Sequence, residues 1–173
     1  MPVPADKQGD RQRKGDMLPF LDKMMSDAWQ TAVALSSAVR EGAAHRGLSV
    51  QESELIKVRA SQINGCAFCL DLHSREARQS GLPQQALDLL PAWRETAVFG
   101  ERERAVLAVA EAATLIPLSE KSVADLSSAR SILGEDTFVA AEWMAVTINT
   151  FNRISILSGH PVRPRDADGM LIR

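Results

Sequence analysis

The chain has 173 residues, 45% of them hydrophobic and 24% charged, with a formal net charge of −2 at pH 7. Its length suits one domain with a sizeable core, and both fractions are ordinary for a globular protein. The small net charge, with Glu and Arg mixed along the chain, argues against nucleic acid as a partner, and no run of about 18 apolar residues predicts a membrane span. The polar start carries no secretory signal and there are only two cysteines, so we expect a cytoplasmic location.

Hydrophobic periodicity predicts a single all-α domain with two polar ends. Residues 1–16 combine Pro, Gly and charge, and we expect them to form a mobile extension. Residues 17–158 are expected to form the helical domain, because no segment alternates as a half-buried strand would. Residues 159–173 carry two prolines and alternating charges and are expected to form a tail.

Apolar spacing and capping residues predict the helices of this domain. Ser49 with Glu52 matches a capping box, and Gly81 suits the residue after a helix end. A helix over 136–157 would be apolar on nearly every face, which favours a central or interface position and a protein that is not a monomer. In chain order, we expect helices at about 24–43, 49–64, 66–81, a short one from Pro83, 101–116, 119–133 and 136–157.

The strongest functional signal is the segment 64–73, Asn-Gly-Cys-Ala-Phe-Cys-Leu-Asp-Leu-His, which contains both cysteines and one of three histidines. In a cytosolic protein such a dithiol is typically catalytic or metal-binding. On a helix, Cys66, Cys69 and His73 would share one face, and two cysteines three apart lie about 5 to 6 Å apart at their side-chain origins, close to the span of a disulfide. The helix start would also favour the thiolate.

The spacing leaves open which cysteine attacks a substrate. His73 lies four residues after Cys69 and could accept its proton, which makes Cys69 the attacking group. Cys66 lies nearer the helix start and would be the usual nucleophile in a thioredoxin-like arrangement.

The stretch from Glu54 to His73, with residues 92–96, 101–105 and 147–153, resembles the alkylhydroperoxidase D-like branch of the carboxymuconolactone decarboxylase superfamily. The resemblance covers about residues 24–157. It implies an all-helical fold that assembles through helix packing as a homotrimer or a hexamer of trimers. It also implies a peroxidase that needs no bound cofactor and reduces hydroperoxides through a redox-active disulfide.

The same resemblance implies roles for individual residues. Cys69 would attack the peroxide, Cys66 would resolve the product, and Glu54 and His73 would relay protons. A dithiol or lipoyl-type electron donor would restore the reduced pair. The best-known peroxidases of the family carry a second histidine between the cysteines, where this chain has Phe68.

Two other functions compete with this interpretation. One is a lyase of the carboxymuconolactone decarboxylase type, which would act on a ring carboxylate without needing the dithiol. The other is a non-catalytic zinc module with Cys66, Cys69, His73 and Glu54 as ligands. Taken alone, Glu54 is typical of a solvated helix residue paired with a neighbour such as Lys57.

The remaining polar candidates are assigned no chemistry. His45 and His160 lie in expected loops and receive no role. Asn149 and Asn152 are expected to cap or cross-link buried backbone near the active helix.

Overall fold

The computed structural model describes residues 18–166 and 169–172. Within them the structure is helical, apart from an isolated bridge between Arg165 and Leu171, and the all-α prediction is confirmed. The expected extension at 1–16 lies outside the described residues. The elements are α2 (Leu21–Met24), α3 (Ser26–His45), α4 (Val50–Asn64), α5 (Ala67–Gln79), α6 (Gln84–Leu89), the 3-10 helix η1 (Leu90–Glu95), α7 (Glu101–Thr114), α8 (Glu120–Leu133) and α9 (Glu135–Ser158).

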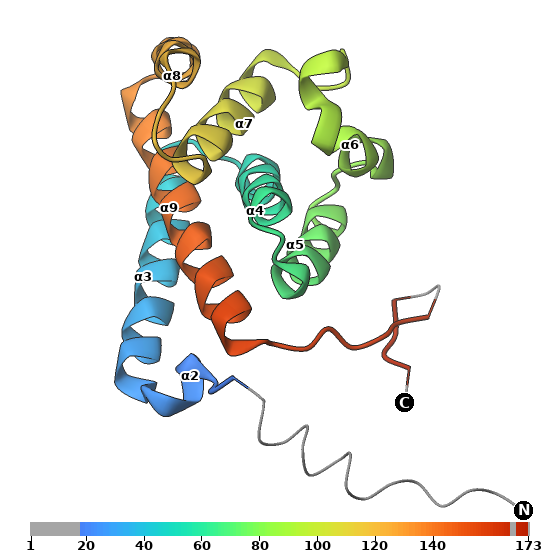
Figure 1. Ribbon diagram of the computed structural model, residues 1–173. Helices are drawn as coiled ribbons and strands as arrows, with labels where there is room; N and C mark the ends of the chain where they lie inside the picture. Colours follow the sequence, from blue (N-terminus) through green and yellow to red (C-terminus); the bar gives the residue numbers. More distant parts are fainter. Residues whose placement is uncertain (1–17, 167–168, 173) are drawn as a thin grey trace, which may run out of the picture.

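Helix α4 is the centre of the fold and packs against α5, α7 and α9 (Figure 1). Its apolar residues point into two clusters. Leu55 and Val58 join the cluster shared with α5, α6 and α7, whereas Ile56 and Ala60 join the cluster shared with α3, α7, α8 and α9. Each fully buried Leu or Ile contributes about 1.5–3 kcal/mol, so α4 is fixed from both sides.

The predicted capping box at the start of α4 is present. Glu52 N–H donates to Ser49 Oγ at 3.1 Å, and Ser49 N–H donates to Glu52 Oε2 at 2.8 Å. These reciprocal bonds satisfy two backbone groups that would otherwise lack partners. The position of the helix that carries Glu54 is thereby fixed by local sequence.

The helix expected at 24–43 is present as α3, and a separate short helix, α2, precedes it. Met25 has φ −128° and ψ 71°, which ends α2 before α3 begins. Leu21 N–H donates to Ser158 Oγ at 3.0 Å, so α2 is held against the end of α9 rather than continuing the line of α3. Asp22 is brought close to the C-terminal segment as a result.

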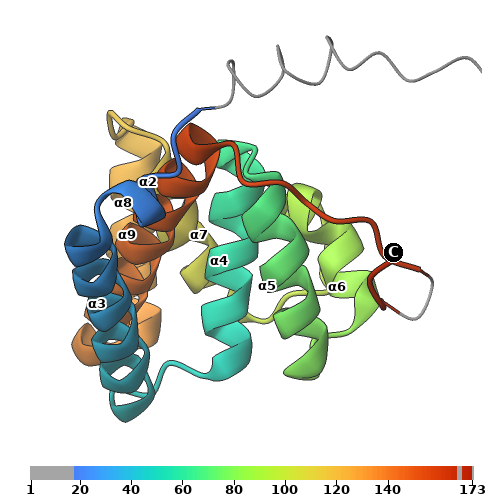
Figure 2. The same cartoon turned by 90° about the horizontal axis from the view of Figure 1, so that it is seen from below.

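Helix α9 lies along α3 and also packs against α4, α7 and α8. It is buried on its inner side, but Trp143, Val146 and Leu157 are at least half exposed. After α9 the chain crosses the ends of α4 and α5 (Figure 2), where Arg165 Nε lies 3.4 Å from Asp71 Oδ1. In the part of the chain that the structure describes, no helix combines the length and apolarity of a membrane span.

Candidate active site

Cys66 and Cys69 lie where α4 ends and α5 begins. Gly65 adopts φ 66°, and Cys66 N–H donates to Ser61 O at 3.0 Å, which is the Schellman pattern. Cys66 is therefore the N-cap of α5, and its sulfur accepts a hydrogen bond from Cys69 N–H at 3.4 Å. Only Cys69 lies inside the helix, because the left-handed turn at Gly65 delays its start to Ala67.

Both sulfurs are unbridged and buried, with Cys66 1% and Cys69 3% exposed. The Cys69 thiol lies 3.8 Å from Ser155 Oγ on α9. Burial, together with the hydrogen bond and charge of Cys66, raises the pKa of Cys69 to about 11, although Asn152 and Ser155 act in the opposite direction. The expectation that the helix start favours a thiolate is thus wrong for Cys69, because the sulfur is withdrawn from water.

Glu54 and His73 form the second part of the site. Glu54 Oε1 accepts from Lys57 Nζ at 2.7 Å, which confirms the predicted pair, but Glu54 is buried between α4 and α5 and not solvated as expected. His73 Nδ1 lies 3.1 Å from Glu54 Oε2 and 3.0 Å from Glu76 Oε2. Burial disfavours the charged imidazole, but the hydrogen bonds with both carboxylates outweigh it and raise the pKa of His73.

These contacts also fix the protonation of the His73 ring. Ionised carboxylates only accept hydrogen bonds, so Nδ1 carries the hydrogen and Nε2 is the atom left to exchange a proton. Among the described residues, no hydrogen bond joins the His73 ring to either sulfur. We expected a direct proton transfer from Cys69 to His73, and these residues make no contact in the described structure through which it could occur.

A cavity of about 390 Å³ opens between α2, α3, α4, α5 and α9. Cys69 and His73 both line it, whereas Cys66 does not, and Glu54 lies behind His73. Thr147 Oγ1 in the same wall is buried and has no hydrogen-bond partner among the described residues. The full lining consists of Asp22, Trp29, Ser36, Lys57, Phe68, Cys69, Leu72, His73, Met144, Thr147, Ile148, Phe151, Ser155 and His160.

His160 is the site residue that the sequence analysis missed. It was given no role, yet it lines the cavity, with Nδ1 3.4 Å from Ser155 Oγ and Nε2 3.1 Å from Asp22 Oδ1. A signal was present in the sequence, because glycine after a long helix predicts a turn that folds the next residue back onto the last helical turn. His45, by contrast, is exposed on α3 and lies outside the cavity lining.

Among the described residues, the acidic and histidine groups close enough to hold a metal ion are those of Glu54, His73 and Glu76. Their ligand atoms lie within 4.8 Å of one another. The cysteines are outside this group, so the structure does not bring together the four ligands of the zinc hypothesis.

Asparagines connect the helices beneath the cysteines. Asn64 Nδ2 donates to Asn149 Oδ1 and to Asn152 Oδ1, each at 2.8 Å, and Asn152 Nδ2 donates to Ser61 Oγ at 3.0 Å. Asn149 Nδ2 also donates to the backbone oxygen of Ala145. This network ties the end of α4, which directly precedes the two cysteines, to α9.

Comparisons with known proteins identify relatives of the chain. The model of the carboxymuconolactone decarboxylase family matches residues 30–112, which include Glu54, both cysteines and His73. The uncharacterized protein YdfG of Bacillus subtilis (strain 168) is 41% identical over 109 residues, which cover 62% of this chain and 73% of YdfG. A crystal structure of ATU0492 from Agrobacterium tumefaciens, a protein of unknown function whose description suggests the antioxidant defence protein AhpD, matches with a TM-score of 0.74 and 33% identity. That match covers 86% of this chain and 100% of the other.

Proposed function

Because the chain belongs to the alkylhydroperoxidase D-like branch of the carboxymuconolactone decarboxylase superfamily, we propose that it is a thiol peroxidase that reduces hydroperoxides through Cys66 and Cys69. The observation that carries the proposal is the position of the two sulfurs. Cys69 lines the cavity, and Cys66 lies directly behind it, in contact with its backbone N–H. A substrate in the cavity therefore meets Cys69 first.

The first step oxidises Cys69. Its sulfur attacks the terminal oxygen of the hydroperoxide, an S–O bond forms, the O–O bond breaks, and the products are Cys69 sulfenic acid and an alcohol. The alcohol oxygen leaves as an anion that needs a proton. His73 supplies it, because the raised pKa from Glu54 and Glu76 keeps this imidazole charged to higher pH.

The second step closes the disulfide. Cys66 Sγ attacks the sulfenic sulfur of Cys69, an S–S bond forms and the S–O bond breaks, and the hydroxide leaves as water with the proton that Cys66 gives up. Both residues sit at the start of α5, so the bond forms within one turn of backbone. An external dithiol, of which a lipoyl group is one example, then reduces the disulfide by exchange and leaves as its own disulfide.

The cavity favours an organic hydroperoxide over hydrogen peroxide. Its volume of about 390 Å³ is in the range of small-molecule sites, and side chains such as Leu72, Met144 and Ile148 make most of it apolar. An apolar lining of this kind binds the organic group of such a substrate, which hydrogen peroxide lacks.

We also propose that the protein works in the cytoplasm as a homotrimer or a hexamer of trimers. Cellular reductants there would keep both cysteines reduced between turnovers. The exposed apolar side chains of α9, Trp143, Val146 and Leu157, support association through helix packing.

The test is hydroperoxide consumption with dihydrolipoamide or dithiothreitol as donor. We expect Cys69→Ser to lose turnover, and Cys66→Ser to stop at a sulfenic acid that dimedone traps on Cys69. The exposed His45→Gln variant is the matched control and retains activity. One equivalent of cumene hydroperoxide should remove both thiols of the wild type without an intermolecular crosslink.

Full consumption by Cys69→Ser would overturn the proposal. Turnover of a carboxymuconolactone by the Cys66→Ser, Cys69→Ser double variant would point to the lyase instead. Stoichiometric zinc in protein purified without added metal would point to the metal-binding alternative.

A further inference from the structure

His160 and Asp22 come from the two ends of the described chain and meet beside Cys69. Gly159 has φ 60° and ends α9, and His160 N–H then donates to Ser155 O at 3.1 Å. This Schellman turn places the His160 ring over the last turn of α9. Its position is therefore set by the backbone as well as by side-chain contacts.

A continuous line of hydrogen-bond contacts leads from the sulfur to this ring. Cys69 Sγ lies 3.8 Å from Ser155 Oγ, and Ser155 Oγ lies 3.4 Å from His160 Nδ1. On the far side, His160 Nε2 lies 3.1 Å from Asp22 Oδ1.

One assignment of hydrogens satisfies all three contacts. The Asp22 carboxylate only accepts, so Nε2 of His160 carries a hydrogen and Nδ1 of the neutral ring is an acceptor. Ser155 then donates its single hydrogen to Nδ1, and its oxygen accepts from the Cys69 thiol. Every hydrogen bond in the line is donated in the direction that leads from the sulfur through Ser155 and His160 to Asp22.

The ring is held by aromatic contacts on two sides. Phe20 stacks on it, with centroids 5.3 Å apart and an interplanar angle of 23°, and Phe68 lies 5.3 Å away at 56°. The His160 side chain is 14% exposed. Phe68 lies between the two cysteines in the sequence. The His160 imidazole therefore packs against a residue that lies between Cys66 and Cys69.

We propose that Ser155, His160 and Asp22 form the path by which Cys69 loses its proton before it attacks the peroxide. The Cys69 proton moves to Ser155 Oγ as the Ser155 proton moves to His160 Nδ1. The products are a Cys69 thiolate and an imidazolium that donates to Asp22. The use of this thiolate against a peroxide rests on the proposed function, whereas its formation does not.

The two histidines of the cavity then have different tasks. His73 Nδ1 is engaged by two carboxylates and its ring makes no hydrogen bond to a sulfur within the described residues, so it serves as the acid for the leaving oxygen. His160 reaches the sulfur through Ser155 and serves as the base. In these terms Ser155 contacts the reacting atom, and His160 and Asp22 are positioning residues that act through it.

The experiment isolates Cys69 in a Cys66→Ser background, where it is the sole cysteine of the chain. Alkylation by iodoacetamide and thiolate ultraviolet absorbance are followed against pH. The key variant is His160→Phe, which keeps an aromatic ring between Phe20 and Phe68 but has no ring nitrogen. The pH profiles must be compared with the titration of the other charged and titratable groups around the path. These groups are Asp22 and Lys23 from α2, Lys57 from α4, and Cys69 and His73 from α5.

We expect His160→Phe to slow alkylation near neutral pH by about a hundredfold, the lower range for a positioned base, and to move the profile to higher pH. Ser155→Ala should have the same effect. The two changes together should be no worse than either alone, because both interrupt one path. Asp22→Asn should have a smaller effect, and His45→Phe should have none.

An unchanged alkylation profile in His160→Phe would overturn the proposal. So would additive losses in the double variant, since these indicate two independent structural effects. If His160→Phe does not fold by circular dichroism, His160→Gln replaces it, because this side chain can still donate to Asp22 but cannot carry the proton. A wild type that consumes no hydroperoxide while His160→Phe still shifts the alkylation profile would refute the proposed function and leave the proton path standing.

Discussion

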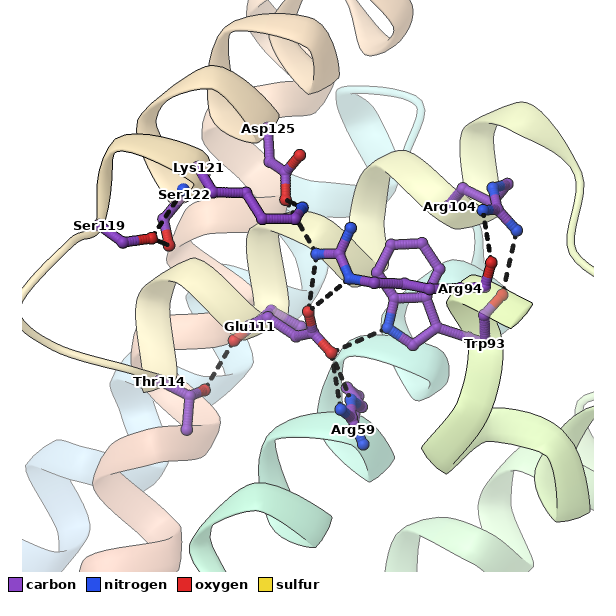
Figure 3. Close-up of polar contacts among 11 residues, drawn as sticks. Arg59, Trp93, Arg94, Arg104, Glu111, Thr114, Ser119, Lys121, Ser122 and Asp125 are labelled. Atoms are coloured by element: carbon purple, nitrogen blue, oxygen red, sulfur yellow. Dashed lines mark hydrogen bonds and ion pairs between the residues drawn. The ribbon is translucent and has the colours of Figure 1, made fainter. Parts of the chain in front are cut away.

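Two carboxylates on neighbouring helices, the buried Glu54 on α4 and the partly buried Glu111 on α7, have different surroundings. Glu111 Oε1 accepts from Arg59 Nη2 at 2.6 Å and from Trp93 Nε1 at 2.8 Å, and its Oε2 accepts from Arg94 Nη2 at 2.8 Å (Figure 3). None of these donors releases a proton near neutral pH. Glu54 instead shares its oxygens between Lys57 and His73, and the imidazole is a group that titrates.

The difference separates a structural carboxylate from one suited to proton transfer. Burial disfavours the ionised form of Glu111, but the hydrogen bonds from Trp93, Arg94 and Arg59 outweigh it and lower its pKa. Its charge is therefore fixed, and it ties α4, η1 and α7 together. Glu54 contacts the His73 ring, which lines the cavity, so it is linked to a group that can pass a proton to a substrate.

The largest effect should come from Glu54→Gln. We expect hydroperoxide turnover to fall by about 10²–10³-fold, because the amide cannot hold His73 in its charged form. Stability should fall less than in Glu111→Gln, since the amide oxygen still accepts from Lys57. Steady-state turnover and urea unfolding measured on the same preparation check both parts, and wild-type activity in Glu54→Gln would remove Glu54 from the mechanism.

Glu111→Gln should show the opposite pattern. Two arginines, of which Arg59 is only 16% exposed, would lose their carboxylate, and the free energy of unfolding should fall by about 2–3 kcal/mol. Turnover per folded molecule should be retained because Glu111 is outside the cavity lining. If Glu111→Gln had normal stability but impaired turnover, Glu111 would not be the structural carboxylate that the comparison with Glu54 makes it.

The sequence predicts the contacts of these carboxylates where the two partners are near each other in the chain. The capping box of Ser49 and Glu52 and the pair of Glu54 and Lys57 follow from three-residue spacing on a helix, and both are present. The partners of Glu111 could not be predicted in this way. Arg59 is 52 positions from Glu111, and only the packing of α4 on α7 brings the two residues together.

The residues of the candidate site likewise include some that the sequence predicts and some that only the folded chain brings together. Glu54, Cys66, Cys69 and His73 lie within one family pattern, whereas Asp22 is 138 positions from His160. Gly159 predicts the turn that places His160, but the closing contact depends on the break in helix at Met25. The raised pKa of Cys69 was also missed, because burial is a property of the assembled helices and not of the start of one.

Stability should depend on pH in opposite directions at the two clusters. The pKa of folded His73 is raised above its ordinary 6.5, so its contribution is complete below that value and is lost as pH rises through the folded pKa. The pKa of folded Glu111 is lowered from 4.5, so its contribution is complete above that value and is lost as pH falls through the folded pKa. The His73 effect should be the smaller, since Glu76 is 42% exposed and solvent screens it.

Urea unfolding at a series of pH values measures both contributions. The difference between wild type and His73→Gln should shrink on the alkaline side, and the difference between wild type and Glu111→Gln should shrink on the acid side. Parallel curves for all three proteins would mean that neither cluster is linked to folding in the way the contacts indicate.

The smallest effect should come from Trp93→Phe, which removes one donor to Glu111 and leaves the ring. The indole lies 4.2 Å from the Arg94 guanidinium and 5.2 Å from that of Arg104, and a phenyl ring preserves most of both contacts. The cost is then that of one hydrogen bond to a charged acceptor, about 1–2 kcal/mol, with no change in Cys69 alkylation. In a Glu111→Gln background, Trp93→Phe should cost less, because the acceptor of the lost hydrogen bond is no longer charged. The difference between the two costs in unfolding free energy measures how much of the cluster's stability depends on the Glu111 charge. An equal cost in both backgrounds would mean that Trp93 acts through packing alone.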